Sequence, residues 1–204
     1  MIMKAVITGD IVNSQEADSE NWLPKLKQLL EKWGKTPTDW EIYRGDEFQL
    51  KCDIEEVFWT ALTIKSLVKQ FENLDVRIAI GIGEEQYSSE KITESNGTAY
   101  VHSGRLLNEI KNEGKTFAIR TPDETINADL GILFKWCSLD FDSWTIAVSE
   151  IVHLLMLDKN LTQDDLAKKL GISQSSVSQR IKRANLDLIL ETDQYFRKKI
   201  AELK

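Results

Sequence analysis

The pattern of apolar and polar positions over residues 1–83 predicts alternating strands and helices. Short β-branched and apolar runs bounded by turn residues are typical of buried strands, and apolar residues that recur every three or four positions are typical of helices. The predicted elements are a strand at 4–12, a helix at 22–33, strands at 40–43 and 48–52 around a hairpin turn at 44–47, an amphipathic helix from the cap Asp53 to about Asn73, and a strand at 76–83.

This β-α-β-β-α-β order predicts a ferredoxin-like α+β fold, a four-stranded antiparallel sheet with two helices on one face. The first crossover makes the first two strands parallel, and the hairpin then returns the third strand beside the first. The end of the first strand, which carries Asp10, therefore meets the hairpin tip, which carries Asp46. We expect these two carboxylates at one edge of the sheet.

The rest of the chain predicts mainly helices. The expected elements are a helix at 98–112 closed by Gly114, a short strand at 116–120, largely helical chain at 125–158, and an amphipathic helix at 186–203. Asp142-Ser143 is the best candidate boundary, with Ser143 as the cap of a helix that runs to Leu157. We therefore predict an α+β domain at 1–142 and an all-α domain at 143–204.

A stretch near the C-terminus has the pattern of a helix-turn-helix DNA-binding unit. Thr162 and Ser173 are N-cap residues for two successive short helices. Gly171 lies between the helices, where a tight turn needs a positive φ. Ala167 is small where the helices must approach, and Val177, six residues after the glycine, is expected to be a buried core residue of the second helix. This spacing is typical of the motif.

The outer face of the second short helix carries residue types that suit base edges and phosphates. The predicted DNA-binding residues are Ser173, Gln174, Ser175, Ser178, Gln179, Arg180, Lys182 and Arg183. The plain alternative is a helical hairpin whose polar face is only solvated. No β-wing follows, and the helix at 186–203 either packs on the three-helix unit or pairs with a second subunit. Because dimeric DNA readers need a pairing surface, we expect a homodimer on double-stranded DNA.

The charge distribution supports two separate roles. The chain of 204 residues has a net charge of −7, which argues against a protein that coats nucleic acid. Residues 1–142 hold 16 Lys and Arg against 25 Asp and Glu, whereas 143–204 hold 10 against 8. Within 166–186 there are five basic residues and no acidic one. Such asymmetry indicates that the acidic and basic parts have different partners.

Composition excludes several classes of protein. No apolar run reaches membrane-spanning length, and the N-terminal apolar run is too short for a signal peptide. The two cysteines, Cys52 and Cys137, lie far apart and form no metal-binding pair. We expect reduced thiols, a cytoplasmic location and no membrane partner.

Three N-terminal segments resemble class III nucleotidyl cyclases and the related diguanylate cyclase (GGDEF) domains. These segments are TGDIVNS at 8–14, RGDEF at 44–48 and RIAIGIG at 77–83. The resemblance implies a palm-like sheet on which Asp10 and Asp46 hold Mg²⁺ with a nucleoside triphosphate. The GTAYVHSGR segment resembles the cyclase helix that ends in a catalytic arginine, which implies that role for Arg105.

Over nearly its whole length the chain also resembles the SatD family of bacterial proteins. The elements VITGDIVNS, RGDEFQL, RIAIGIG and SGR, and the predicted helix-turn-helix tail, all fit that family. This resemblance by itself implies no particular activity.

The chemistry of the N-terminal residues is consistent with a metal and a phosphate chain. Adjacent carboxylates do not both stay ionised cheaply without a cation, and Mg²⁺ prefers carboxylates and phosphate oxygens. The predicted nucleotide-binding residues are Ile11, Val12, Asn13 and Ser14, whose amides and hydroxyl lie before a helix. The plain alternative is that Asp10 caps a turn and that Gly45-Asp46 is ordinary hairpin chemistry.

Three positions depart from the cyclase pattern. Val101 stands where cyclases have the transition-state asparagine, Ile42 stands at the base-reading position, and Arg44 replaces the first glycine of the diguanylate cyclase motif. These losses put cyclisation in doubt and leave triphosphate binding open. The leading hypothesis is a DNA-binding, transcription-regulating protein whose N-terminal domain senses a Mg²⁺-nucleotide. The alternatives are a nucleotidyl cyclase or nucleotidyltransferase, and a degenerate palm that is only a dimerisation scaffold.

Overall fold

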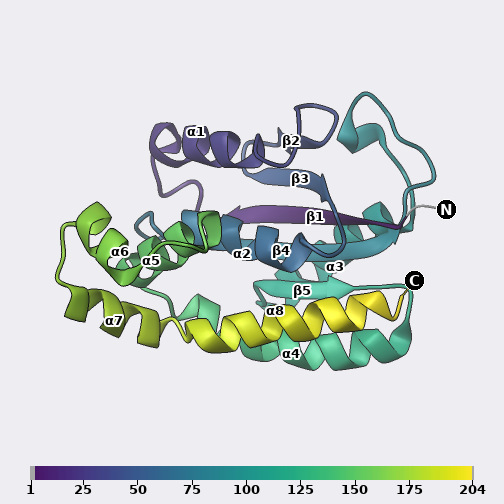
Figure 1. Ribbon diagram of the computed structural model, residues 1–204. Helices are drawn as coiled ribbons and strands as arrows, with labels where there is room; N and C mark the ends of the chain where they lie inside the picture. The colour runs from purple at the N-terminus through teal and green to yellow at the C-terminus, as the bar shows by residue number, and fades with distance from the viewer. Residues whose placement is uncertain (1–2, 204) are drawn as a thin grey trace.

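A computed structural model describes residues 3–203 and shows a mixed α+β protein with one five-stranded sheet and, over these residues, eight α-helices (Figure 1). The strands are β1 (Met3–Val12), β2 (Trp40–Tyr43), β3 (Glu47–Cys52), β4 (Asp75–Glu84) and β5 (Phe117–Arg120). The helices are α1 (Ser19–Leu30), α2 (Val57–Val68), α3 (Thr98–Glu113), α4 (Glu124–Asp142), α5 (Ile146–Leu157), α6 (Gln163–Leu170), α7 (Gln174–Arg183) and α8 (Leu186–Ala201), with a short 3-10 turn at Ile92–Glu94.

The strand order is β2-β3-β1-β4-β5. Strand β1 is central and antiparallel to both β3 and β4, so the third strand lies beside the first, as predicted. The predicted short strand at 116–120 becomes β5, which extends the sheet parallel to β4. In this register Asp10 pairs with Glu47 on one side and with Arg77 on the other.

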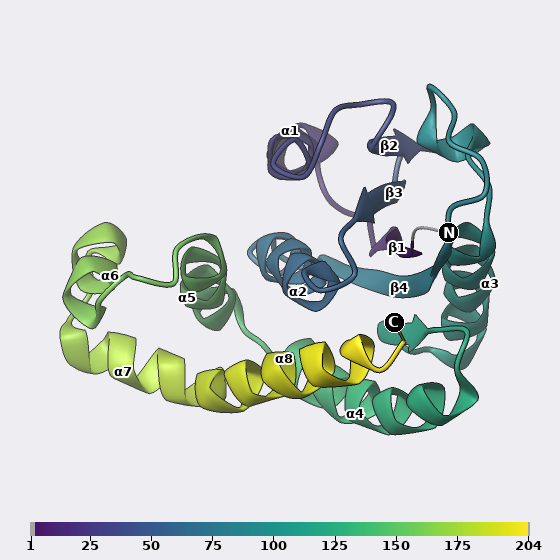
Figure 2. The same ribbon diagram turned by 45° about the vertical axis from the view of Figure 1, so that its right-hand side comes forward.

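Helices cover both faces of the sheet (Figure 2). On one face Ala5 and Ile7 pack in the main core with α1 and α2, as the predicted order requires. On the other face Val6 packs against α3, and Thr8 donates a hydrogen bond to Ser103 of α3 at 2.9 Å. Asp10 alternates with these residues along β1 and so points to the α3 face.

Helix α2 differs from the amphipathic helix predicted from the sequence. It begins after Glu56 rather than at a cap by Asp53, it ends at Val68, and all twelve of its residues are buried. The reason is its position, because α2 contacts the sheet, α1, α5 and α8 and so has no solvent face. Two of its buried hydroxyls are satisfied within the helix, because Thr63 donates to the carbonyl oxygen of Trp59 at 2.8 Å and Ser66 to that of Thr63 at 2.9 Å.

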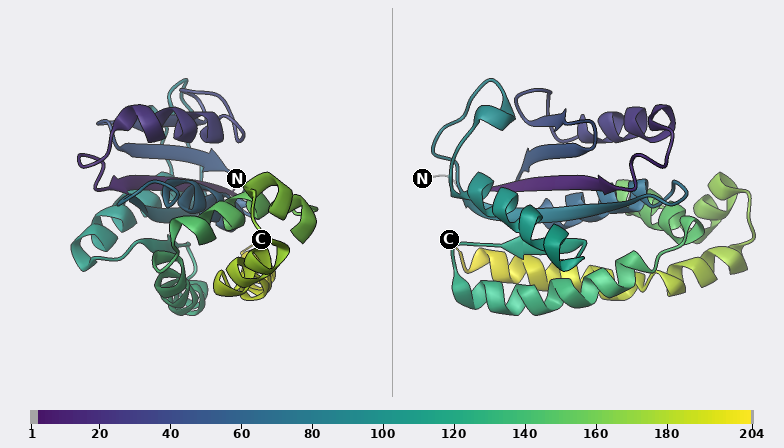
Figure 3. Two further views of the ribbon diagram at one scale, coloured as in Figure 1. Left: turned by 90° about the vertical axis from the view of Figure 1, so that its left-hand side faces the viewer. Right: turned by 180° about the vertical axis from the view of Figure 1, so that it is seen from behind.

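The C-terminal helices form a further layer that shares the main core. Figure 3 shows α4 and α8 side by side along one side of the molecule. Phe196 of α8 lies 5.7 Å from Phe58 of α2 and 6.3 Å from Phe134 of α4, centroid to centroid. Residues 143–203 therefore do not stand apart from the sheet, although α6 and α7 have a small apolar cluster of their own with α5.

The predicted boundary at Asp142-Ser143 coincides with the end of α4. The cap of the next helix, however, is Thr145 and not Ser143. The Thr145 hydroxyl accepts a hydrogen bond from the amide of Val148, whereas the Ser143 hydroxyl donates back to the carbonyl oxygen of Asp140. Ser143 thus closes one helix instead of opening the other.

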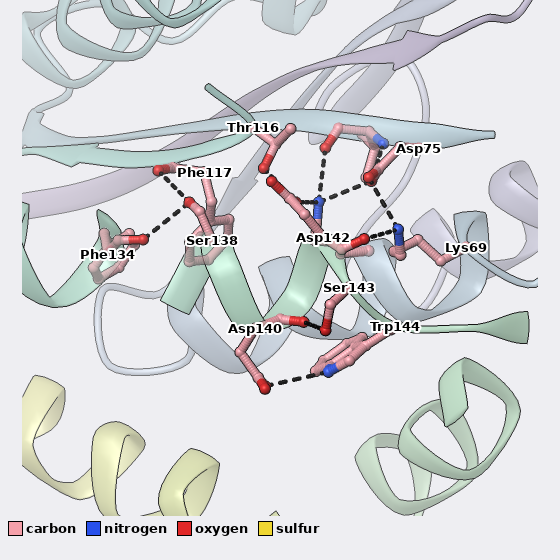
Figure 4. A network of polar contacts seen from close by, with 12 residues as sticks. Lys69, Asp75, Thr116, Phe117, Phe134, Ser138, Asp140, Asp142, Ser143 and Trp144 are labelled. Carbon is pink, nitrogen blue, oxygen red and sulfur yellow. Dashed lines mark hydrogen bonds and ion pairs between the residues drawn. The ribbon is translucent and has the colours of Figure 1, made fainter. Parts of the chain in front are cut away.

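A buried polar network ties α2, β4 and the end of α4 together (Figure 4). Lys65 is fully buried, and its Nζ lies 2.8 Å from Asp75 Oδ1 and 2.8 Å from Asp142 Oδ1. Lys69 adds a second cation 3.1 Å from Asp75 and donates to the Asp142 carbonyl oxygen. Because a buried ammonium is costly without partners, this network fixes the α4 end on the sheet. No helix in residues 3–203 is long and apolar enough to cross a membrane.

Candidate functional sites

The end of β1 brings together a compact group of charges. Asp10 is buried, and its carboxylate lies 2.8 Å from Arg77 of β4 and 3.1 Å from Lys111 of α3. Lys111 also lies 2.7 Å from Glu47 at the start of β3. Although burial lowers the pKa of Lys111, its bonds to Glu47 and Asp10 outweigh this and raise the pKa above its usual value. Lys111 therefore stays charged between two carboxylates.

Asp46 lies beside this group but has different contacts. Its carboxylate accepts a hydrogen bond from the Ser14 hydroxyl at 2.7 Å, and its carbonyl oxygen accepts from the amide of Ile11 at 3.1 Å. Over the part of the chain that the structure describes, no ion pair involves Asp46. The carboxylates that share a cation are thus Asp10 and Glu47. Asp46, in the β2–β3 hairpin turn, instead bonds the end of β1 and the turn that follows it.

The predicted phosphate cradle at Ile11–Ser14 is largely used within the fold. Ile11 is buried and its amide is bonded to the hairpin, while Val12 ends β1. Asn13 has a positive φ of 61° and its side-chain amide donates to the Asn73 carbonyl oxygen. This geometry joins the end of β1 and the β1–α1 turn to the β2–β3 hairpin turn and to the α2–β4 turn. Of the four residues only Asn13 is exposed.

A hollow of about 470 Å³ lies between the β2–β3 hairpin and α3. The hairpin contributes Tyr43, Arg44 and Glu47, and α3 contributes Tyr100 and Arg105. Burial, with help from Glu47, raises the pKa of Tyr43 to about 12, so its hydroxyl remains a hydrogen-bond donor. The hollow therefore offers two guanidinium groups and two phenol rings from separate elements.

The hollow gathers some of the predicted residues and leaves out others. Arg105 and Val101, one helical turn apart on α3, both line it. None of Ile11–Ser14, Asp10 or Asp46 lines it, but Glu47 does and connects it to Asp10 through Lys111. The structure thus places Arg105 in a hollow beside, and not within, the group of charges at Asp10.

The placement of these side chains does not fit a metal ion held by Asp10 and Asp46. The donor types suit Mg²⁺. Lys111, however, lies between Asp10 and Glu47 where a cation would bind, Arg77 holds the other Asp10 oxygen, and Asp46 is bonded to Ser14. No cluster of three metal-binding side chains occurs within residues 3–203.

The second candidate site is the unit formed by α6, its turn and α7. Thr162 and Asp165 form a reciprocal capping box at the start of α6, Gly171 ends that helix with a φ of 65°, and Ser173 caps α7. Leu166 and Val177 are completely buried against α5. Local sequence signals explain this unit, because both helices begin at a side-chain cap and the turn between them has its glycine.

The outer face of α7 is polar and free of acidic side chains. Exposed on or just before α7 are Ser173, Gln174, Ser175, Ser178, Gln179, Lys182 and Arg183. Arg180 is the exception among the predicted contacts, since its guanidinium bonds Glu150 at 3.2 Å and the Ala147 carbonyl oxygen at 3.3 Å, both on α5. Arg180 therefore anchors α7 to α5.

Sequence reasoning missed the two cations at Asp10. Arg77 was visible as the first charged residue of the RIAIGIG strand, but only the register of β4 against β1 puts it opposite Asp10. Lys111 lies near the end of α3 and carries no local signal. The available clue was only that the helix predicted at 98–112 carries a basic residue near its end.

Comparison with curated proteins and with solved structures gave no match. A profile of the SatD family matches residues 4–200, which include the group of charges at Asp10, the hollow and the α6–α7 unit. The chain therefore belongs to the SatD family.

Proposed function

We propose that this protein binds double-stranded DNA through α7, as a transcription regulator of the helix-turn-helix type. The observation that carries the proposal is the exposed, acid-free face of a short helix that is capped at its start and buried on its other side by Val177. Helix-turn-helix proteins place such a helix in the major groove, where its first residues meet base edges.

The residues of α7 divide by chemistry. Gln174, Ser178 and Gln179 carry neutral groups that donate and accept, which suits base edges. Lys182 and Arg183 lie at the end of α7 and suit backbone phosphates. Arg180 keeps the helix seated on α5 and is a positioning residue. The acidic N-terminal part repels DNA, so contact is expected through α7 alone.

The test is an affinity measurement with the full chain, because α5 and α8 share the main core. Duplexes selected from a random library would be titrated over a range of salt concentrations. Lys182→Ala and Arg183→Ala are each expected to weaken binding and to lower the salt slope by about 0.9. Lys198→Ala, an exposed lysine on α8, is the matched control. Equal effects of all three variants, or no salt-dependent affinity in the wild type, would contradict the proposal.

A second candidate function is nucleotide binding in the hollow between the hairpin and α3. The observation that favours it is the pair Arg44 and Arg105, which come from separate elements and line one hollow with Tyr43. Guanidinium groups bind phosphates in a bidentate way and phenol rings pack on bases, so the chemistry fits a nucleoside triphosphate. Since Lys111 stands where a metal would bind, this candidate needs no Mg²⁺. Cyclisation is not proposed, because Val101 offers no polar group.

This second candidate is tested by thermal shifts with ATP, GTP, CTP and UTP, each with and without Mg²⁺. A ligand that binds only the folded state raises the Tm. We expect at least one triphosphate to raise the Tm. Arg105→Ala should abolish this rise, and Arg183→Ala, on the proposed DNA-binding helix α7, should leave it unchanged. No shift with any triphosphate would leave the N-terminal part as a scaffold. A shift that appears only with Mg²⁺ would contradict the metal-free arrangement.

A further inference from the structure

The outer surface of the α4–α8 pair exposes large apolar side chains. Trp136 and Leu139 of α4 are 70% and 67% exposed, and Leu188 of α8 is 60% exposed. Single exposed apolar residues are ordinary, but contiguous ones mark interaction sites. These three are contiguous, because they line one groove of about 540 Å³ that runs between the two helices.

The shape of this surface is a ridge beside a groove. Trp136 and Leu139 lie three positions apart on α4, and both also line a second hollow on the far side, which Lys135 borders. They therefore form a ridge with the groove toward α8 on one side and Lys135 on the other. A ridge next to a groove of matching chemistry is self-complementary under a two-fold rotation.

We propose that the α4–α8 surface binds a second copy of this chain, in a two-fold dimer in which the ridge of each copy fills the groove of the other. The two-fold axis lies parallel to the helices, because an axis across them would set ridge against ridge. Under this rotation the side of α4 that carries Lys135 faces the α8 helix of the other copy. Residues at the same height along the axis in one copy remain at the same height in the dimer.

The charges on the two helices match this arrangement. Helices α4 and α8 are antiparallel, since Asn185 bonds Asp140 at 2.6 Å near one end and Lys199 bonds Asp129 at 2.9 Å near the other. These two contacts place Lys135 of α4 and Glu191 of α8 at the same height along the common direction of the two helices.

Neither Lys135 nor Glu191 makes a side-chain ion pair or hydrogen bond within residues 3–203, and both are exposed. In the dimer Lys135 of one copy meets the partner's Glu191.

The dimer also has a consequence for α7, because only Ala184 and Asn185 separate α7 from α8, and Asn185 has a left-handed backbone with a φ of 49°. Self-association through α4 and α8 therefore brings two α7 helices into one particle, as a two-fold DNA site requires. The inference does not rest on DNA binding, since the mass of the particle is measured without DNA.

The first test is sedimentation equilibrium of the full chain. The wild type is expected to dimerise, and Trp136→Ala is expected to raise the dimer Kd by at least about 30-fold, as truncation of a central aromatic anchor does. Tyr87→Ala is the control, because Tyr87 is 60% exposed in a loop outside the groove. A wild type that stays monomeric up to its solubility limit, or equal dimerisation of both variants, would overturn the proposal.

A charge exchange tests the register. Lys135→Glu and Glu191→Lys are each expected to raise the Kd by roughly 2- to 20-fold, because one exposed pair is lost twice per dimer. The double variant is expected to return toward the wild-type Kd. Both positions are exposed, so circular dichroism should show unchanged folding. A double variant as weak as, or weaker than, either single variant would overturn the proposed register.

Discussion

The ammonium group of Lys65, which is completely buried in α2, lies 2.8 Å from the carboxylate of Asp142 at the end of α4. The same ammonium lies 2.8 Å from Asp75 at the start of β4. One lysine of α2 thus joins strand β4 to the end of α4, from which the chain continues into α5–α7. Strand β4 also carries Arg77, the partner of Asp10. This one strand therefore connects the group of charges at Asp10 to the buried network at the end of α4.

Asp75→Ala is expected to lower the free energy of unfolding by about 3 kcal/mol, because it leaves a buried charge with one partner fewer. Asp142→Ala is expected to cost less, since Asp142 is 38% exposed and Lys65 keeps Asp75. Urea unfolding followed by circular dichroism gives both values.

Glu90→Ala is the control for these two variants, because Glu90 is an exposed acid that takes no part in the ion pairs of Lys65 and Lys69. It should leave the unfolding free energy within about 0.5 kcal/mol of the wild type. A larger cost for Asp142→Ala than for Asp75→Ala would mean that the junction, and not the strand, is the main support of Lys65.

The stability of the protein should fall in acid because of Asp75. Burial alone raises the pKa of Asp75, but Lys65 and Lys69 outweigh it and hold the pKa below its usual value. A carboxylate with a lowered folded pKa contributes stability that is complete above its unfolded pKa of about 3.9 and is lost as pH falls through the folded pKa.

The measurement is the unfolding free energy of the wild type and Asp75→Asn between neutral pH and pH 2. We expect the difference between the two proteins to be constant at neutral pH and to narrow below about pH 4. A difference that widens in acid would contradict the lowered pKa.

Gly81→Ala tests the close packing of α3 on β4. A Cβ at position 81 would press on the carbonyl oxygen of Ala99 and the amide nitrogen of Ser103, which are backbone atoms that cannot rotate away. We expect a loss of about 1–3 kcal/mol, measured by urea unfolding. Gly131→Ala is the matched control, because a Cβ there meets nothing within 4 Å inside α4, and it should stabilise by up to about 1 kcal/mol.

Lys111→Met tests whether the lysine takes the place of a metal ion. In the wild type Lys111 neutralises Asp10 and Glu47, so neither EDTA nor Mg²⁺ is expected to change the Tm in the absence of nucleotide. In Lys111→Met the two carboxylates lose the cation between them and keep only Arg77 beside Asp10 and Arg44 at 3.9 Å from Glu47. Mg²⁺ should then raise the Tm. An EDTA-sensitive wild type, or no response of the variant to Mg²⁺, would show that Lys111 is not a substitute for a cation.

Local signals in the sequence predicted the elements whose ends depend on neighbouring residues. The short helices α6 and α7 follow from the caps Thr162 and Ser173 and from Gly171. In the structure each helix begins directly after its predicted cap, and α6 ends at Gly171. Strand β1 and the hairpin followed in the same way from apolar runs and turn residues. Period and capping act over a few residues, so one sequence is enough to identify them.

Only the tertiary structure decided which of these elements touch. The register of β1 placed Asp10 against Glu47 and Arg77, and the crossing of α3 added Lys111, so the group of charges differs from the expected pair of Asp10 and Asp46. The complete burial of α2 had the same origin, because helices distant in the sequence pack on the face that its polar residues suggested was solvent. The sequence by itself determined where strands, helices and turns lie; long-range packing, which no local pattern encodes, determined the partners of each charge.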